Sequence, residues 1–170
     1  MSTRLHRRFL GPLWPVPAAE GGKIFENISL SPLAIRSLHH LMSAPGRWRA
    51  GPLFGHVADD TLQIHVAAPG SDRHSLYGVL EGNAAYQLGW ADALHGLGLT
   101  HLDWVGTWLM SPNNLLPSYT DAEFWLHQGA KTSLFDDQTV LLACGLQEQR
   151  HEFDAYRLID DRVIVIPTQH

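Results

Sequence analysis

Apolar residues recur along this chain with two periods that alternate from segment to segment. Between residues 32 and 43, and again between 76 and 97, they follow the spacing of a helix with one buried face. Between residues 61 and 67 they alternate with polar residues, as in a strand that buries one side. Periods that alternate in this order predict an α/β domain in which helices flank a mixed β-sheet.

Local signals predict where the elements begin and end. Ser31 and Pro32 are typical of an N-cap and a first helical residue, and Pro45-Gly46 should end that helix. Asp59-Asp60 predicts a hairpin turn, and Asp160-Asp161 predicts the last one. The other expected elements are strands at 52–57, 101–109, 139–144, 152–158 and 163–166, and a helix that Ser118 caps and that runs to about His127.

The composition bounds the class of protein. The chain has 170 residues, of which 45% are hydrophobic and 17% charged, and this fits one globular domain with a sizeable core. The net charge of −5 argues against a nucleic-acid partner, because binding to phosphates needs a basic surface. The single cysteine, Cys144, allows no intrachain disulfide, and its apolar neighbours predict a buried core thiol.

The first 27 residues lack a clean period and predict an extended N-terminal arm, followed by one domain over residues 28–170. Arg7 and Arg8 precede an apolar stretch, which is the charge order of a signal peptide, but three prolines interrupt that stretch. Nowhere does the chain approach the roughly 20 apolar residues of a membrane span. We therefore expect a cytoplasmic protein that does not enter a membrane.

The segment from residue 105 to 121 carries a recognisable motif. It contains Val105-Gly106, Pro112, Pro117-Ser118 and Asp121. These residues are in register with the pattern V-G-x-x-H-x-H-P followed by P-S-x-x-D. The segment therefore resembles the metal loop of the JAB/MPN (JAMM) metalloisopeptidases, in their prokaryotic form.

Two further segments support the resemblance, which spans about residues 28–167. Residues 49–55 resemble the family segment E-x-G-G-L-L-x-G, and residues 154–158 resemble a late strand that often reads A-Y-R. The resemblance implies a JAB/MPN-like fold, which is related to that of cytidine deaminases. It also implies a zinc bound by two histidines and an aspartate, with a glutamate from the earlier hairpin as general base and the serine stabilising the oxyanion.

The positions that would hold this chemistry are altered. Leu109 and Ser111 stand where the family has its two histidines, and neither suits zinc as imidazole does. The position of the glutamate falls on Trp48, or on Arg49 if the register slips by one residue. Ser118 and Asp121 are retained, but their spacing is also that of a capping box, and we expect capping to be their present role.

Other residues could form a site elsewhere. None of the 11 histidines occurs in a metal-binding spacing such as H-x-H or H-E-x-x-H, although His56 and His65 could face each other across the first hairpin. Four of the six tryptophans lie near the altered positions, and two interpretations stay open: an aromatic cluster that fills the former metal pocket, or separate core residues. These four are Trp48, Trp104, Trp108 and Trp125.

The resemblance implies a catalytically inactive JAB/MPN-like domain that binds a protein partner. That partner would be a ubiquitin-like protein or another subunit of a conjugation pathway, and a homodimer is a further option. The former active-site groove would bind it through residues Trp48, Trp108, Ser111, Ser118 and Asp121. No cofactor is expected. The alternative is an active metallo-(iso)peptidase with relocated ligands, which would need zinc. A stand-alone structural domain is a third hypothesis.

Overall fold

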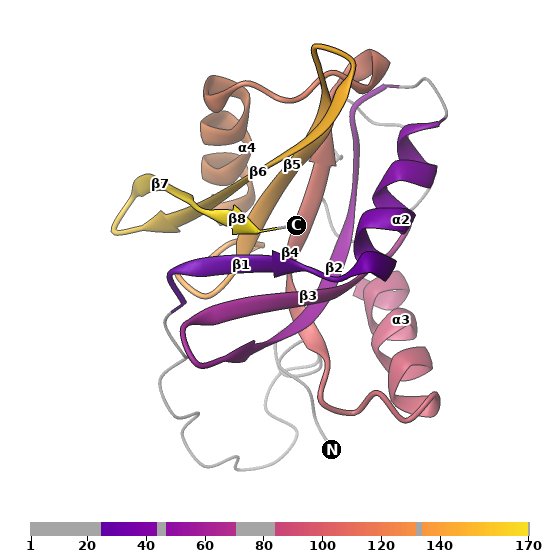
Figure 1. The fold of residues 1–170 in the computed structure, drawn as a ribbon. Helices are drawn as coiled ribbons and strands as arrows, with labels where there is room; N and C mark the ends of the chain where they lie inside the picture. The colour runs from indigo at the N-terminus through magenta and orange to yellow at the C-terminus, as the bar shows by residue number, and fades with distance from the viewer. Residues whose placement is uncertain (1–24, 44–46, 71–83, 132–133, 170) are drawn as a thin grey trace.

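The computed structural model describes residues 25–43, 47–70, 84–131 and 134–169. The strands and helices that the sequence predicts occur in the expected order, and the structure adds two strands that the sequence does not predict, one before the first helix and one at the end (Figure 1). The strands are β1 (Asn27–Leu30), β2 (Arg49–Ala58), β3 (Thr61–Ala67), β4 (Asp103–Met110), β5 (Val140–Gln147), β6 (Arg150–Ile159), β7 (Arg162–Ile166) and β8 (Thr168–Gln169). The helices are α2 (Pro32–Met42), α3 (Ala84–Gly96), α4 (Tyr119–Lys131) and the short 3₁₀ turn η1 (Pro112–Asn114).

The eight strands form one mixed sheet in the order β7-β6-β5-β4-β2-β3-β1-β8. β4 pairs with β5 in parallel, as β1 does with β3 and β8, whereas the other pairs are antiparallel. The sheet curves so strongly that it nearly closes into a barrel (Figure 1). The expected mixed sheet with flanking helices is therefore confirmed at this level of detail.

The two faces of the sheet bury separate apolar cores. One core lies under α2 and includes Trp108 and Met110 of β4. The other lies under α3 and α4 and includes Trp104 and Leu109 of the same strand. Adjacent residues of β4 thus point to opposite faces, as the pleat of a strand requires. This alternation decides which residues can share a site.

The helix ends match the local signals. Ser31 is the N-cap of α2, where its Oγ accepts a hydrogen bond from the Ala34 N–H at 3.1 Å, and Pro32 is the first helical residue. α3 ends in a Schellman motif: Leu99 N–H donates to the Leu94 carbonyl at 3.0 Å, and Gly98 takes φ +81°. The part of the expected second helix from 76 to 83 lies outside the described residues.

The hairpin turns rest on residues with left-handed backbone. Asp160 and Asp161 have φ values of 48° and 61°, which is the pattern of a type I′ turn, and Asp59 has φ 54°. Both expected hairpins are confirmed. A third turn, between β5 and β6, uses Glu148 and Gln149 with φ values of 51° and 65°. Glu-Gln is not a usual sequence for such a turn, so the sequence does not predict it.

The described part of the domain begins slightly before the expected boundary at residue 28. Phe25 is buried, and its carbonyl accepts a hydrogen bond of 2.8 Å from Arg157 Nη1. Asn27 already opens β1, and residues 1–24 of the arm expected over residues 1–27 lie outside the described residues. Cys144 is fully buried, so the expected core thiol is confirmed, and burial raises the pKa of that thiol. No helix in the described ranges is long and apolar enough to cross a membrane.

Candidate functional site

The pairing of β2 with β4 distinguishes between Trp48 and Arg49, the two positions to which the resemblance assigns a glutamate. Ala50 pairs with Leu109, and both lie in the core under α3 and α4, where Trp48 also packs. Arg49 faces the other way: its Nη1 donates to the Leu41 carbonyl of α2 at 2.6 Å. Trp48 is therefore the residue that shares a face with Leu109.

The two positions of the histidine ligands are closed by packing and internal hydrogen bonds. Leu109 has no exposed surface and lies in the core with Ala122, Trp125 and Leu126 of α4. Ser111 is 8% exposed, and its hydroxyl donates to the Leu115 carbonyl within the loop that follows β4. A zinc ion therefore finds an apolar side chain at one position and a hydroxyl already in use at the other.

The loop between β4 and α4 lies against β5. Leu116 N–H donates to the Leu146 carbonyl at 3.3 Å, and a Cβ on Gly145 would come within 2.3 Å of the Leu116 nitrogen. The absence of a side chain at Gly145 is what allows this approach. Asn114 fixes the other side of the loop, because its Nδ2 donates to the Met42 carbonyl at 2.6 Å and its Oδ1 accepts from Arg49.

Ser118 and Asp121 form a reciprocal capping box at the start of α4. The Asp121 N–H donates to Ser118 Oγ at 3.2 Å, and Asp121 Oδ2 accepts from the Ser118 N–H at 2.9 Å. The same oxygen accepts from the Ser118 hydroxyl at 2.6 Å. The expected capping role is confirmed. The carboxylate also lies in the first turn of α4, at the positive end of the helix dipole.

An aromatic cluster lies beside these positions, and it consists of Trp48, Phe124 and Trp125. The rings of Trp48 and Trp125 meet edge to face at 5.7 Å between centroids, and those of Phe124 and Trp125 at 5.2 Å. Trp125 is buried, Trp48 is half-buried, and Phe124 is 51% exposed. The cluster therefore includes Trp48, the position to which the resemblance assigns the general base, and reaches the surface through Phe124.

Trp108 was expected in the former groove, and the structure corrects this. Its side chain lies on the opposite face of β4, in the core under α2, and only 1% of it is exposed. Its Nε1 donates to the Ala68 carbonyl at 2.7 Å. The reason is the strand alternation: a neighbour of Leu109 cannot point to the same face. Trp104 is a separate buried residue of the core under α3 and α4.

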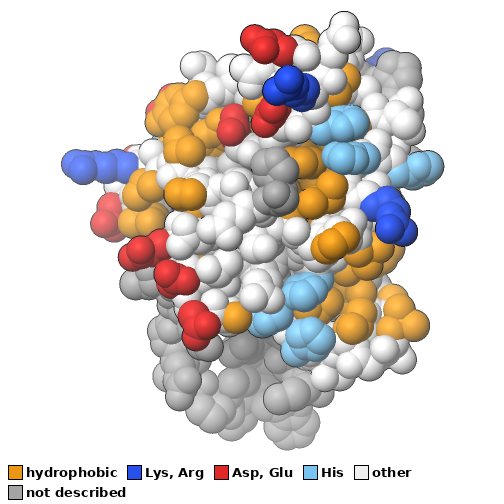
Figure 2. Space-filling view, viewed as in Figure 1, with side chains coloured by type: hydrophobic (Ala, Val, Ile, Leu, Met, Phe, Trp, Pro, Cys, Tyr) orange, Lys and Arg blue, Asp and Glu red, His pale blue; other side chains and the backbone are white. Residues whose placement is uncertain are grey.

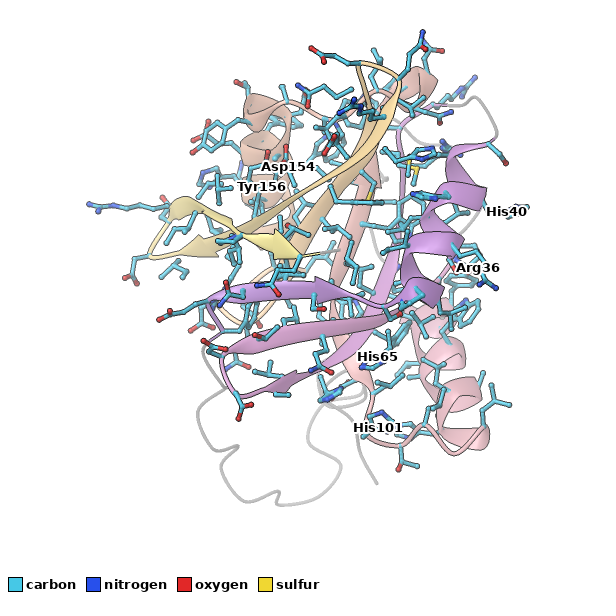
Figure 3. All side chains as sticks on the ribbon, viewed as in Figure 1. Arg36, His40, His65, His101, Asp154 and Tyr156 are labelled. Carbon is cyan, nitrogen blue, oxygen red and sulfur yellow. The ribbon has the colours of Figure 1, made fainter. Side chains whose placement is uncertain are left out.

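Asp154 and Tyr156 of β6, which are labelled in Figure 3, lie on the same face of the sheet as Leu109. Asp154 pairs with Ala143, which pairs with Leu109, so all three lie in one row across the sheet. The Tyr156 hydroxyl donates to Asp154 Oδ2 at 3.4 Å. Burial and the Asp154 carboxylate raise the pKa of Tyr156 to about 12, so the phenol stays protonated. In the sequence these two residues belong to the segment 154–158, for which the resemblance predicts a strand but no functional role.

Within the described ranges, no three His, Cys, Asp or Glu side chains are arranged to hold a metal ion. His56 and His65 do face each other, with stacked rings 5.1 Å apart. His101 joins them from the segment before β4, at 5.4 Å from His56 and 6.1 Å from His65. No local sequence signal connects His101 to the hairpin, so the sequence alone does not predict this contact.

Comparisons with known proteins bear on the fold. No family model matches the chain, and no curated protein matches it significantly. Among solved structures, the chain is similar to protein DSY2949 from Desulfitobacterium hafniense, known from a solution structure. The two are 18% identical, the match covers 84% of this chain and 91% of the other, and the TM-score is 0.54. At this identity the likeness shows a shared fold alone.

Proposed function

We propose that this chain is a non-catalytic domain of the JAB/MPN type that binds a protein partner. The proposal rests on the resemblance of residues 105–121 to the metal loop of that family and on the side chains that occupy the catalytic positions. In the family it resembles, active members cleave ubiquitin-like conjugates and inactive members support other subunits. A chain that keeps the loop without its ligands fits the second group.

The observation that carries the proposal is the closed packing at the ligand positions. A hydrolytic zinc site needs three protein ligands and an open position for water. Leu109 is fully enclosed, and the Ser111 hydroxyl is used within its own loop. Trp48 cannot take a proton from water as a glutamate can. Of the three positions that the resemblance assigns to zinc ligands, only Asp121 carries a ligand of the family's type, and its carboxylate caps α4.

The aromatic cluster is the surface that we assign to the partner. Large aromatic side chains with one exposed edge are typical of the residues that dominate binding energy at protein interfaces. Phe124 is 51% exposed, and two further apolar side chains lie exposed at or before the start of α4: Leu115 at 58% and Tyr119 at 46%. Exposed apolar groups in one region favour a protein over a small polar ligand. The proposed partner is a ubiquitin-like protein bound through its tail.

The test measures binding of a ubiquitin-like protein, with ubiquitin as the probe, by tryptophan fluorescence and by light scattering of the mixture. Phe124→Ser should weaken binding at least tenfold, because it removes an aromatic anchor while leaving the core intact. Leu97→Ser is the matched control: Leu97 is 77% exposed near the end of α3 and lies outside the cluster. This substitution should leave the affinity for ubiquitin unchanged.

The same samples separate the proposal from the enzyme hypothesis. Incubation of the wild-type chain with zinc and a ubiquitin fusion should give no hydrolysis above the uncatalysed rate. Zinc-dependent hydrolysis that disappears on Asp121→Ala would show an active peptidase with relocated ligands. Light scattering of the chain alone tests for the homodimer, and a Phe124→Ser variant that fails to dissociate such a dimer would place its interface elsewhere.

A further inference from the structure

A cleft of about 440 Å³ opens between the start of α2, the end of β3 and the segment before β4. It shares no residue with the aromatic cluster. Its volume is in the range of sites that bind small organic molecules. Figure 2 shows pale-blue histidine side chains beside an orange apolar surface on this side of the molecule. The cleft is lined by Ser31, Pro32, Leu33, Arg36, His65, Val66, Leu99, His101 and Leu102.

The polar lining of the cleft is basic. Arg36 comes from α2, His65 from β3 and His101 from the segment before β4, and all three are labelled in Figure 3. No acidic residue belongs to the described lining. His65 Nε2 is buried and has no hydrogen-bond partner among the described residues. A buried ring nitrogen without a partner costs free energy, which a ligand recovers only when the ring turns to bring this nitrogen into the cleft.

The rest of the lining is apolar. Pro32 and Leu33 contribute it from the first turn of α2, Val66 from β3, and Leu99 and Leu102 from the segment that follows α3. Leu33 is 55% exposed, so part of this apolar surface faces water in the free protein. A ligand that covers it gains the free energy of removing apolar area from water. The cleft therefore combines basic and apolar side chains.

We propose that this cleft binds an organic monocarboxylate with an apolar body. Arg36 supplies one permanent positive charge and a planar guanidinium, which matches a carboxylate in charge and in shape. His65 and His101 supply ring nitrogens for further hydrogen bonds to the same group. A single fixed cation balances a monoanion, whereas a phosphate dianion would be left with uncompensated charge. The apolar body of the ligand lies against Leu99 and Leu102.

The same geometry makes binding dependent on pH. Burial lowers the pKa of His65, and the neighbouring rings of His56 and His101 lower it further, so the ring is neutral at pH 7 in the free protein. The groups that surround His65 in the described structure are His56, His101 and, in the lining of the cleft, Arg36, and all three are basic. A bound carboxylate adds negative charge and favours the protonated ring. Affinity should therefore rise as the pH falls from 7.5 to 5.5, with uptake of protons on binding.

The test uses the full chain and two probes that carry the same chemistry: octanoate, and an acetylated peptide that ends in leucine with a free carboxyl group. Calorimetric titrations at pH 7.5 and 5.5 should show saturable binding of at least one probe, with higher affinity at the lower pH. Preference for one probe identifies the source of the carboxylate as a free acid or a chain terminus. Octanamide and the amidated peptide, which lack the charge, should bind at least tenfold more weakly.

Variants locate the site. Arg36→Gln should reduce affinity about tenfold or more, and His65→Gln should reduce both the affinity and the proton uptake. Arg162→Gln removes an exposed arginine from β7, far along the sheet order from β3, and it should change neither. Absence of saturable binding by both probes would overturn the proposal, as would equal binding of the neutral amides. Binding that Arg36→Gln leaves unchanged would also overturn it.

Discussion

Asp121 is the residue whose role depends most on its neighbours. In the motif that it matches, an aspartate at this position binds metal, whereas here its Oδ2 accepts hydrogen bonds from both the N–H and the hydroxyl of Ser118. The same carboxylate can serve either purpose, because both need an ionised oxygen at the start of a helix. What separates the two roles is the presence of further ligands, and Leu109 and Ser111 do not provide them.

The capping role predicts a specific loss of stability. Asp121→Ala should lower the free energy of unfolding by roughly 1 kcal/mol, because it removes two hydrogen bonds and a favourable charge at the start of α4. Urea denaturation measures this change. Gln128→Ala is the control, since Gln128 is exposed on the same helix, and it should stay within about 0.5 kcal/mol of wild type. A loss confined to metal content, with unchanged stability, would contradict the capping role.

Trp48 rather than Arg49 should be the position from which a general base can act. In a Leu109→His, Ser111→His variant with zinc, adding Trp48→Glu should raise hydrolysis of a ubiquitin fusion by about 10²–10⁴. Adding Arg49→Glu should not, because that side chain is directed toward α2. Kinetic assays of the two triple variants decide this. If the double variant stays folded and binds no zinc, the match of residues 105–121 to the metal loop is wrong.

At the scale of the elements, the loop from β4 to α4 is held by contacts with strands on either side. Arg49 and Asn114 fix it to the end of α2, and Gly145 lets its second half lie on β5. The shape of the loop therefore depends on residues more than 20 positions away in the sequence.

Gly145→Ala should disturb this loop. The added Cβ would meet the backbone of Leu115 and Leu116 at about 2.4 Å, so the loop must shift. We expect a loss of roughly 1–3 kcal/mol, measured by thermal unfolding. Gly89→Ala is the matched control within α3, where a Cβ has no neighbour within 4 Å, and it should stabilise the protein by about 0.5–1 kcal/mol. Equal effects of the two substitutions would show that the loop does not depend on Gly145.

For the whole molecule, the nearly closed sheet brings histidines from distant elements together. His39 of α2 stacks on His151 of β6 at 4.0 Å, while His56 and His65 of the first hairpin meet His101. Burial lowers the pKa of His39 and of His65, and the nearby imidazoles lower both further. The pKa of each group is therefore lower in the folded state than its usual value of 6.5.

This arrangement predicts that acid weakens the fold. Because the pKa of both histidines is lower in the folded state, the unfolded state binds more protons below about pH 6.5. Their titration therefore leaves the free energy of unfolding undiminished above that pH and decreases it as the pH falls further. The melting temperature should be lower at pH 5.5 than at pH 7.5. His39→Gln should reduce this difference, whereas His40→Gln, an exposed residue on the same helix, should not. A melting temperature that stays constant between these two pH values would contradict the prediction.

The sequence by itself determined the features that depend on near neighbours. Ser31 and Pro32 start α2, Asp160-Asp161 turns the last hairpin, and the spacing of Ser118 and Asp121 makes a capping box. Each of these follows from the stereochemistry of a few adjacent residues. The alternation of apolar residues also predicted the mixed sheet with its helices. Strand alternation could have placed Trp108 on the face opposite Leu109 from the sequence alone.

Only the tertiary structure decided which distant residues meet. The choice between Trp48 and Arg49 depends on the register of β2 against β4, and the approach of Leu116 to Gly145 depends on the path of a loop across β5. The position of His101 beside His65 has no counterpart in local sequence. Register and loop path are fixed by the packing of whole elements, whose free energy is shared among many weak contacts. No short segment contains that information.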